Sequence, residues 1–207
     1  MKFLYAISAS LLLFVATIAV EAQAPDLSQF DLSTRDGVNA AREAIAGRKL
    51  DDHSRNCVSL DKNLPGIAVV GGFAYDYGCR ISGAFIKSHY FENETPGLSQ
   101  AALDALGWKN AKPKQREEMA TNWVQNGLLT FLTVLSEKNE DFGQRSFEPP
   151  HARSAANGET IVTLWIRMPA GRRRGRSYQR REFKFAADGS LLSAVTAESF
   201  STNPEDE

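Results

Sequence analysis

The chain has 207 residues with a formal net charge of −1 at pH 7, and 43% of its residues are hydrophobic. This length suits one domain with a core of its own, and the near-neutral charge by itself points to no class of partner. Beyond the N-terminus, no segment is long and apolar enough to span a bilayer.

The first 22 residues have the three-part pattern of a secretory signal peptide. A short positive start precedes an almost wholly apolar stretch over residues 3–20, and Ala22 supplies a small residue at the cleavage point. Cleavage is predicted after Ala22, because a cut after Ala24 would put Pro25 next to the scissile bond. The alternative is a retained membrane anchor, although about 18 apolar residues lie at the lower edge of what a span requires. The mature protein is therefore expected to be periplasmic or secreted.

The rest of the chain is divided by composition into three parts. Residues 23–32 are predicted to be a flexible lead-in, 33–201 a single domain, and 202–207 an acidic tail. A capping-box pattern followed by apolar residues at helical spacing predicts a first helix over 34–46, with Gly47 as its stop.

The chain contains two cysteines, Cys57 and Cys79. An even, small number of cysteines in an exported protein predicts a disulfide. Closing a loop of about 20 residues would stabilise the fold by about 3 kcal/mol. Two buried free thiols or a metal pair are the alternatives, but His53 and His89 show no recognised zinc spacing. We therefore predict a disulfide and no metal.

A β-hairpin is predicted next. Two β-like stretches, 67–75 and 79–91, are separated by a turn signal at 76–78. Tyr75 and Tyr77 fall at its tip, where exposed aromatic rings would stack on a sugar or a peptide. They are candidate ligand-binding residues, and the alternative is that they cover the end of the sheet.

Two helices are predicted after the hairpin. The first is short and covers residues 99–107, and the second is a long amphipathic helix over 114–137. Its apolar residues recur at steps of three and four, so it is expected to lie across a sheet as the main core element. A membrane-surface helix is the alternative, but the polar face is not strongly basic. Residues 139–158 read as a polar linker.

Three strands close the domain, at 160–168, 177–186 and 191–200, and Asp188-Gly189 is a hairpin signal between the last two. The element order α-ββ-αα-βββ predicts an α+β fold, with an antiparallel sheet of about five strands packed on the long helix. In element order alone this layout resembles small curved-sheet folds of the cystatin or nuclear-transport-factor-2 type. That resemblance implies a fold and no function.

An arginine-rich segment includes the connection between the first two of these strands, at residues 171–176, and continues to Arg180 and Arg181 just beyond it. Residues 167–184 carry eight cations and one anion. Guanidinium groups bind phosphate and carboxylate in a two-pronged manner. The candidate ligand-binding arginines are Arg172, Arg173, Arg174, Arg176, Arg180 and Arg181. Their expected partner is an anionic component of the cell envelope or another protein, and not nucleic acid. The alternative is a solvated loop that keeps strand edges soluble.

Candidate catalytic groups are few. His89 and Glu92 form an H-x-x-E, but on a strand their side chains point to opposite faces. A metal site there would need further ligands, and only His53 or His151 is available to supply one. The chain lacks G-x-S-x-G, H-E-x-x-H, C-x-x-C and a phosphate-binding glycine loop.

We therefore interpret the chain as an exported, non-catalytic binding or interaction protein of a bacterial cell envelope, with no cofactor. The alternative is a small exported hydrolase with its site in the concave face between the sheet and the long helix. Its candidate groups would be Asp76, His89 and Glu92.

Overall fold

The computed structural model of the protein describes residues 25–71, 79, 82–93, 95–168 and 176–202. The predicted signal peptide lies outside these residues, as does the predicted acidic tail except for Thr202. None of the helices formed by the described residues is long and apolar enough to cross a membrane.

The N-terminal part of the domain is helical. A 3₁₀ turn, η1 (Leu27–Gln29), precedes α1 (Arg35–Ala46), and α2 (Asp52–Asn56) follows. Thr34 Oγ1 accepts a hydrogen bond from the Gly37 backbone N–H, which caps the start of α1. Gly47 adopts the left-handed conformation that ends the helix (φ 63°). The predicted first helix is thus confirmed to within one residue.

The first sheet, called sheet A here, is antiparallel. Within the described ranges its strands are β1 (Val58–Ser59), β2 (Ile67–Val70), β3 (Gly83–Ile86) and β4 (His89–Glu92), paired in that order. The predicted stretch 79–91 is therefore not one strand but two. The chain reverses at Lys87, which lies in the left-handed region (φ 56°), so that β3 and β4 form a hairpin of their own.

A helical layer follows sheet A along the chain. It consists of α3 (Leu98–Ala105), the 3₁₀ turn η2 (Trp108–Asn110), α4 (Pro113–Asn122) and the π-helical turn η3 (Trp123–Leu128). The predicted helix 114–137 is correct over its first part but too long. The chain leaves the helix after Leu128, Phe131 takes a positive φ of 74°, and Thr133–Val134 pair in a sheet as β5.

The second sheet, called sheet B here, is formed by the C-terminal half of the chain. Its elements are β5, β6 (His151–Ser154), β7 (Thr160–Met168), β8 (Ser177–Phe185) and β9 (Leu191–Ser201), with the 3₁₀ turn η4 (Glu140–Phe142) before β6. The strand order is β5-β7-β8-β9, and β6 pairs with β7 as well. The three predicted C-terminal strands are confirmed, as is the turn at Asp188-Gly189, where Asp188 Oδ1 accepts a hydrogen bond from the Ser190 backbone N–H.

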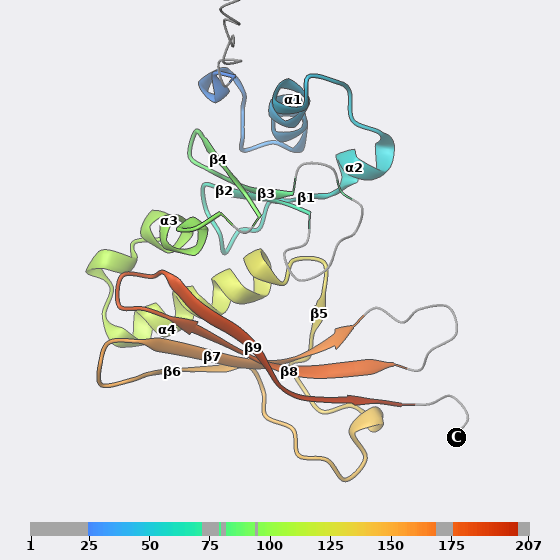
Figure 1. The fold of residues 1–207 in the computed structure, drawn as a ribbon, viewed down its shortest axis with the longest axis vertical. Coiled ribbons are helices and arrows are strands. Elements are labelled where there is room, and N and C mark those ends of the chain that lie inside the picture. Colours follow the sequence, from blue (N-terminus) through green and yellow to red (C-terminus); the bar gives the residue numbers. More distant parts are fainter. Residues whose placement is uncertain (1–24, 72–78, 80–81, 94, 169–175, 203–207) are drawn as a thin grey trace, which may run out of the picture.

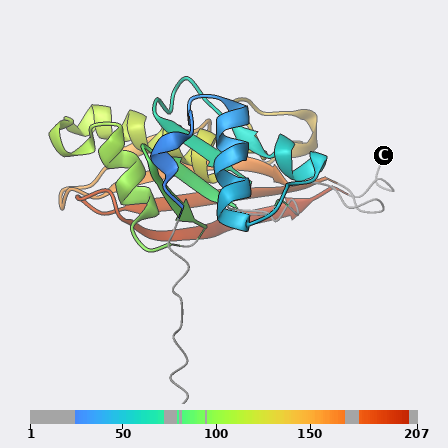
Figure 2. The same ribbon diagram turned by 90° about the horizontal axis from the view of Figure 1, so that it is seen from above.

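These elements stack in layers (Figure 1). Helix α1 covers one face of sheet A, and α3 and α4 lie between sheet A and sheet B (Figures 1 and 2). The largest core cluster joins both sheets to the helical layer, with Ile86 from sheet A, Val124 from the helix and Leu164 from sheet B among its members. The α+β class with antiparallel pairing is confirmed. A single sheet of about five strands on one helix is wrong, because the helical layer is apolar on both sides and separates two sheets.

The indole side chains lie in the core. Trp108 and Trp123 are fully buried between the layers, where Trp108 Nε1 donates to the Ala187 carbonyl (2.9 Å) and Trp123 Nε1 donates to Ser99 Oγ (3.0 Å). Trp165 is buried on the opposite face of sheet B, against Phe142.

Candidate functional site

The arginine-rich segment is only partly described. Arg172, Arg173 and Arg174 lie outside the described residues, as do Tyr75, Asp76 and Tyr77. Arg176 pairs with Asp141 (3.1 Å). Arg180 lies 3.7 Å from Glu148 and 3.8 Å from Glu198. These two predicted ligand-binding arginines therefore face carboxylates of the same chain.

A polar cluster fixes Arg176 at the start of β8. The Tyr178 hydroxyl donates a hydrogen bond to Asp141, and Asn139 Nδ2 donates to the Tyr178 oxygen (3.3 Å). The Tyr178 hydrogen bond lowers the pKa of Asp141, and Arg176 acts in the same direction. Burial raises the pKa of Tyr178. Asp141 is thus an ionised anchor for this end of sheet B.

Arg181 lies on the other face of β8. Side chains alternate along a strand, so Arg181 shares its face with Phe183, which belongs to the core between the layers. The Arg181 Nε is buried and has no hydrogen-bond partner among the residues that the structure describes. No carboxylate in the same set lies within ion-pair distance of it. Arg181 is therefore the one predicted arginine that the described part of the fold turns inward.

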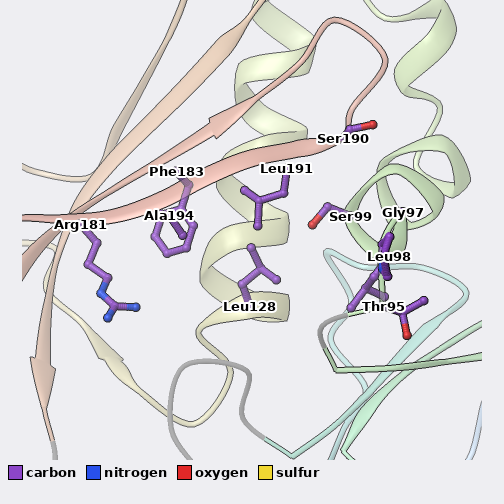
Figure 3. Close-up of a pocket in the computed structure, with 11 residues that line it drawn as sticks. Thr95, Gly97, Leu98, Ser99, Leu128, Arg181, Phe183, Ser190, Leu191 and Ala194 are labelled. Atoms are coloured by element: carbon purple, nitrogen blue, oxygen red, sulfur yellow. The ribbon is translucent and has the colours of Figure 1, made fainter.

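Arg181 lines a cavity of about 550 Å³ between sheet B and the helical layer (Figure 3). We call it the Arg181 cavity. Its described lining residues are Thr95, Pro96, Gly97, Leu98, Ser99, Leu128, Arg181, Phe183, Ser190, Leu191 and Ala194. Strand β8, strand β9, the end of η3 and the start of α3 each supply one side of it.

Apolar side chains form most of this lining. Phe183, Leu191 and Ala194 come from the paired strands β8 and β9, and Leu128 faces them from the helix (Figure 3). The register between β8 and β9 shifts next to Phe185, which places an extra residue in β9 near Leu191. A bulge of this kind re-aims side chains and strengthens the local twist.

The start of α3 supplies the polar end of the lining. Gly97 is its N-cap, with φ 87° and no side-chain cap, so the first N–H groups of the helix receive no side-chain acceptor from that residue. Ser99 accepts the hydrogen bond from Trp123 Nε1, and its oxygen turns toward Leu128 and Leu191 (Figure 3). The Leu98 N–H already donates to the Thr95 carbonyl (3.1 Å), so this end of the lining contributes the Ser99 hydroxyl and the positive end of the helix dipole, which adds to the charge of Arg181.

The groups proposed for a hydrolase are not brought together. His89 and Glu92 are both exposed at opposite ends of β4. His89 borders a separate depression beside α3, where Lys109 pairs with Asp104 (2.8 Å), and Glu92 is not among its described lining residues. Asp76 lies outside the described residues.

The predicted disulfide is confirmed. Cys57 and Cys79 are bonded, with their Cα atoms 6.1 Å apart. His53 is the third member of this group, because its ring lies close to both sulfur atoms. Among the described residues, this group brings three side chains of metal-ligating type together, but the two sulfur atoms are joined in the disulfide and are not thiolates.

The sequence nominated Arg181 for anion binding and, for the alternative hydrolase, a site between the sheet and the long helix, but it did not connect the two or name the other residues of the cavity. Its apolar lining comes from positions that read as ordinary core residues, such as Leu128 and Phe183. A signal was present in β8, where alternation puts Arg181 on the apolar face and Arg180 on the opposite one. The segment 95–99 carried no such signal, because only the fold brings it next to sheet B.

Comparisons with protein-family models, with curated proteins and with solved structures find no match for this chain. The site must therefore be interpreted from its own geometry.

Proposed function

We propose that the protein is an exported, non-catalytic binding protein that holds a small amphipathic anion in the Arg181 cavity. The observation that carries this proposal is a guanidinium turned into a largely apolar cavity without a carboxylate partner among the described residues. The predicted signal peptide and the disulfide support export.

The charge of Arg181 favours an anionic ligand. Arginine stays protonated at any physiological pH, so it does not relieve its burial by losing a proton. A partly buried cation without a counter-charge is unfavourable, and a ligand carboxylate or phosphate would supply that charge through two parallel hydrogen bonds. The positive end of α3 acts in the same direction.

The rest of the lining favours an apolar body on the same ligand. Leu128, Phe183 and Leu191 offer apolar surface on both sides of the cavity. A volume of about 550 Å³ lies within the range of small-molecule sites in proteins. Each buried methylene of a ligand chain would contribute about 0.8 kcal/mol, so an alkyl chain adds to the attraction at Arg181.

The test is calorimetric titration of the purified protein with hexanoate, decanoate and hexadecanoate, each below its micelle concentration, and with decanol as the neutral counterpart. We expect at least one of the three carboxylates to bind, with one molecule of ligand per molecule of protein. Decanol is expected to bind the wild type at least about tenfold more weakly than decanoate does. The variant Arg181→Met is expected to bind the carboxylate at least about tenfold more weakly than the wild type does, and a tenfold change corresponds to about 1.4 kcal/mol.

Arg180→Met is the matched control, because Arg180 is the neighbouring arginine on the opposite face of β8 and pairs with Glu148 and Glu198. It should bind like the wild type. Equal affinity of Arg181→Met and wild type, or no binding of any of the three carboxylates, would show that the cavity is not an anion site.

A further inference from the structure

The disulfide between Cys57 and Cys79 lies next to His53, a third side chain of a type that binds metal ions. His53 and Cys57 are four residues apart on α2 and its C-cap, a spacing that puts two side chains on the same face of a helix. Cys79 joins them through the disulfide. The ligand atoms of all three residues lie within 4.8 Å of one another.

Contacts other than the S–S bond hold the two half-cystines in place. The Cys57 carbonyl accepts a hydrogen bond from the Gly71 backbone N–H (2.9 Å), which fixes Cys57 at the end of sheet A. The Cys79 carbonyl accepts one from Ser82 Oγ (2.9 Å), just before β3. These contacts do not depend on the S–S bond, so after its reduction the two backbones would stay in place while the sulfur atoms move apart by side-chain rotation.

The turn that carries His53 is held as well. Asp51 Oδ1 accepts a hydrogen bond from the Ser54 backbone N–H (2.8 Å), which caps α2. The buried Arg42 donates to the Ser54 carbonyl (2.6 Å) and connects α2 to α1. His53 itself is exposed, whereas Cys57 and Cys79 are 6% and 9% exposed. An ion would thus reach the sulfur atoms from the side of the imidazole.

We propose that reduction of this disulfide creates a Zn²⁺ site formed by Cys57, Cys79 and His53. A dithiol reductant would transfer two electrons and two protons to the disulfide and become a disulfide itself. Zn²⁺ would then displace the two thiol protons and bind two thiolates and the neutral imidazole.

The donor set and the spacing both suit zinc. Two thiolates and one imidazole are the Cys₂His set of a three-ligand zinc site, which leaves a fourth position for water or a substrate. Zinc–sulfur bonds of about 2.3 Å in a tetrahedral site place the two sulfur atoms about 3.8 Å apart. In the disulfide the two sulfur atoms are closer than this, so they would have to move apart, whereas the His53 ring already lies within 4.8 Å of both. This site is independent of the Arg181 cavity.

The experiment compares oxidised and reduced protein, the latter freed of reductant under anaerobic conditions, in titrations with Zn²⁺ alone. Reduced protein is expected to bind one equivalent, and oxidised protein none at the same concentration. Since loss of even an outer-shell partner weakens zinc sites by about 10- to 100-fold, His53→Ala should weaken binding at least about tenfold. The variant His151→Ala, which removes an exposed imidazole on β6, should bind like the wild type.

Circular dichroism of the reduced protein, recorded before and after addition of Zn²⁺, shows whether reduction loosens the fold and whether Zn²⁺ restores it. Native-like ellipticity throughout, or its recovery on addition of Zn²⁺ to the wild type but not to His53→Ala, supports the site. Equal zinc affinity of reduced wild type and His53→Ala, or binding by an unfolded chain without recovery, would overturn it.

Discussion

Arg180 and Arg181 are neighbours in sequence with opposite environments. Arg180 points to the side of sheet B that carries Glu148 and Glu198, and its charge is compensated within the chain. Arg181 points into the apolar side, where the described residues offer it no carboxylate. A fold keeps a cation in such a position at a cost in stability, which binding of the proposed anionic ligand would offset. This contrast makes Arg181, and not the arginine-rich segment as a whole, the residue on which the proposed function rests.

Asp141 provides a prediction at the residue scale, for the dependence of stability on pH. The pKa of Asp141 is lowered in the folded protein, first by the Tyr178 hydrogen bond. A lowered folded pKa means that the ionised carboxylate stabilises the fold above the unfolded pKa of about 3.9, and that this contribution is lost as the pH falls through the folded pKa. Asp141→Asn should therefore reduce the free energy of unfolding by about 1–2 kcal/mol at pH 7, and by less at pH 3.

Urea denaturation of both proteins at the two pH values tests this prediction. Asp36→Asn is the control, since the Asp36 side chain is 96% exposed and lies 3.9 Å from its nearest cationic partner, Arg55. It should change the stability by less than about 0.5 kcal/mol. A loss for Asp141→Asn that is the same at pH 3 and pH 7 would mean that the carboxylate charge is not the cause.

At the scale of elements, Gly127 lies in the π-helical turn at the end of the long helix and packs against Trp123. A Cβ on Gly127 would lie 2.2 Å from Cε3 of Trp123, so the indole packs over this turn only because the side chain is absent. In an ordinary helix, Gly→Ala stabilises by about 1 kcal/mol. Here the clash reverses the sign, and Gly127→Ala should destabilise the protein by about 1–3 kcal/mol in thermal or urea unfolding.

Gln125→Ala, in the same π-helical turn but half-buried, is the matched control. It should stay within about 0.5 kcal/mol of the wild type. An increase in stability for Gly127→Ala would mean that Trp123 is able to move aside and that the π-helical turn does not depend on this glycine.

The same turn explains why the sequence predicted too long a helix. Leu128, Leu132 and Leu135 continue the helical spacing, and nothing local marks the change to β5. The change depends on pairing with β7, a long-range contact that periodicity does not contain. By contrast, α1 and the β8–β9 hairpin were predictable because a capping residue and Asp188-Gly189 act within a few residues of the chain. The reversal at Lys87 had no such marker.

At the scale of the whole molecule, neither the two-sheet arrangement nor the cavity could be read from local pattern. A strand carries the same alternation whether it belongs to sheet A or to sheet B. The cavity joins segments 95–99, 128 and 181–194, and their proximity follows from the stacking of layers. Of the described lining residues, only Arg181 was among the candidates named from the sequence, and it was not distinguished there from the other five arginines. The sequence therefore predicted the positive charge and, only in outline, a position between sheet and helix, but not the set of residues that line the cavity.

The layered core also predicts that the domain unfolds cooperatively. The disulfide ties α2 to the segment before β3 at the sheet A end, whereas the three tryptophans, Trp108, Trp123 and Trp165, lie in the helical layer and in sheet B. Because one core cluster joins both sheets to the helices, the domain should unfold as a unit.

Replacing Cys57 and Cys79 together by alanine should then lower the free energy of unfolding by about 3 kcal/mol when tryptophan fluorescence is the probe, although no tryptophan lies in sheet A. Urea denaturation in the presence of a chelator is followed by tryptophan fluorescence, which reports on the helical layer and sheet B, and by circular dichroism, which reports on the whole domain. Coincident transitions at a lower urea concentration would agree with a single cooperative core. An unchanged fluorescence midpoint beside an earlier loss of ellipticity would mean that sheet A unfolds separately, and that sheet B with its helices keeps the Arg181 cavity without help from the disulfide.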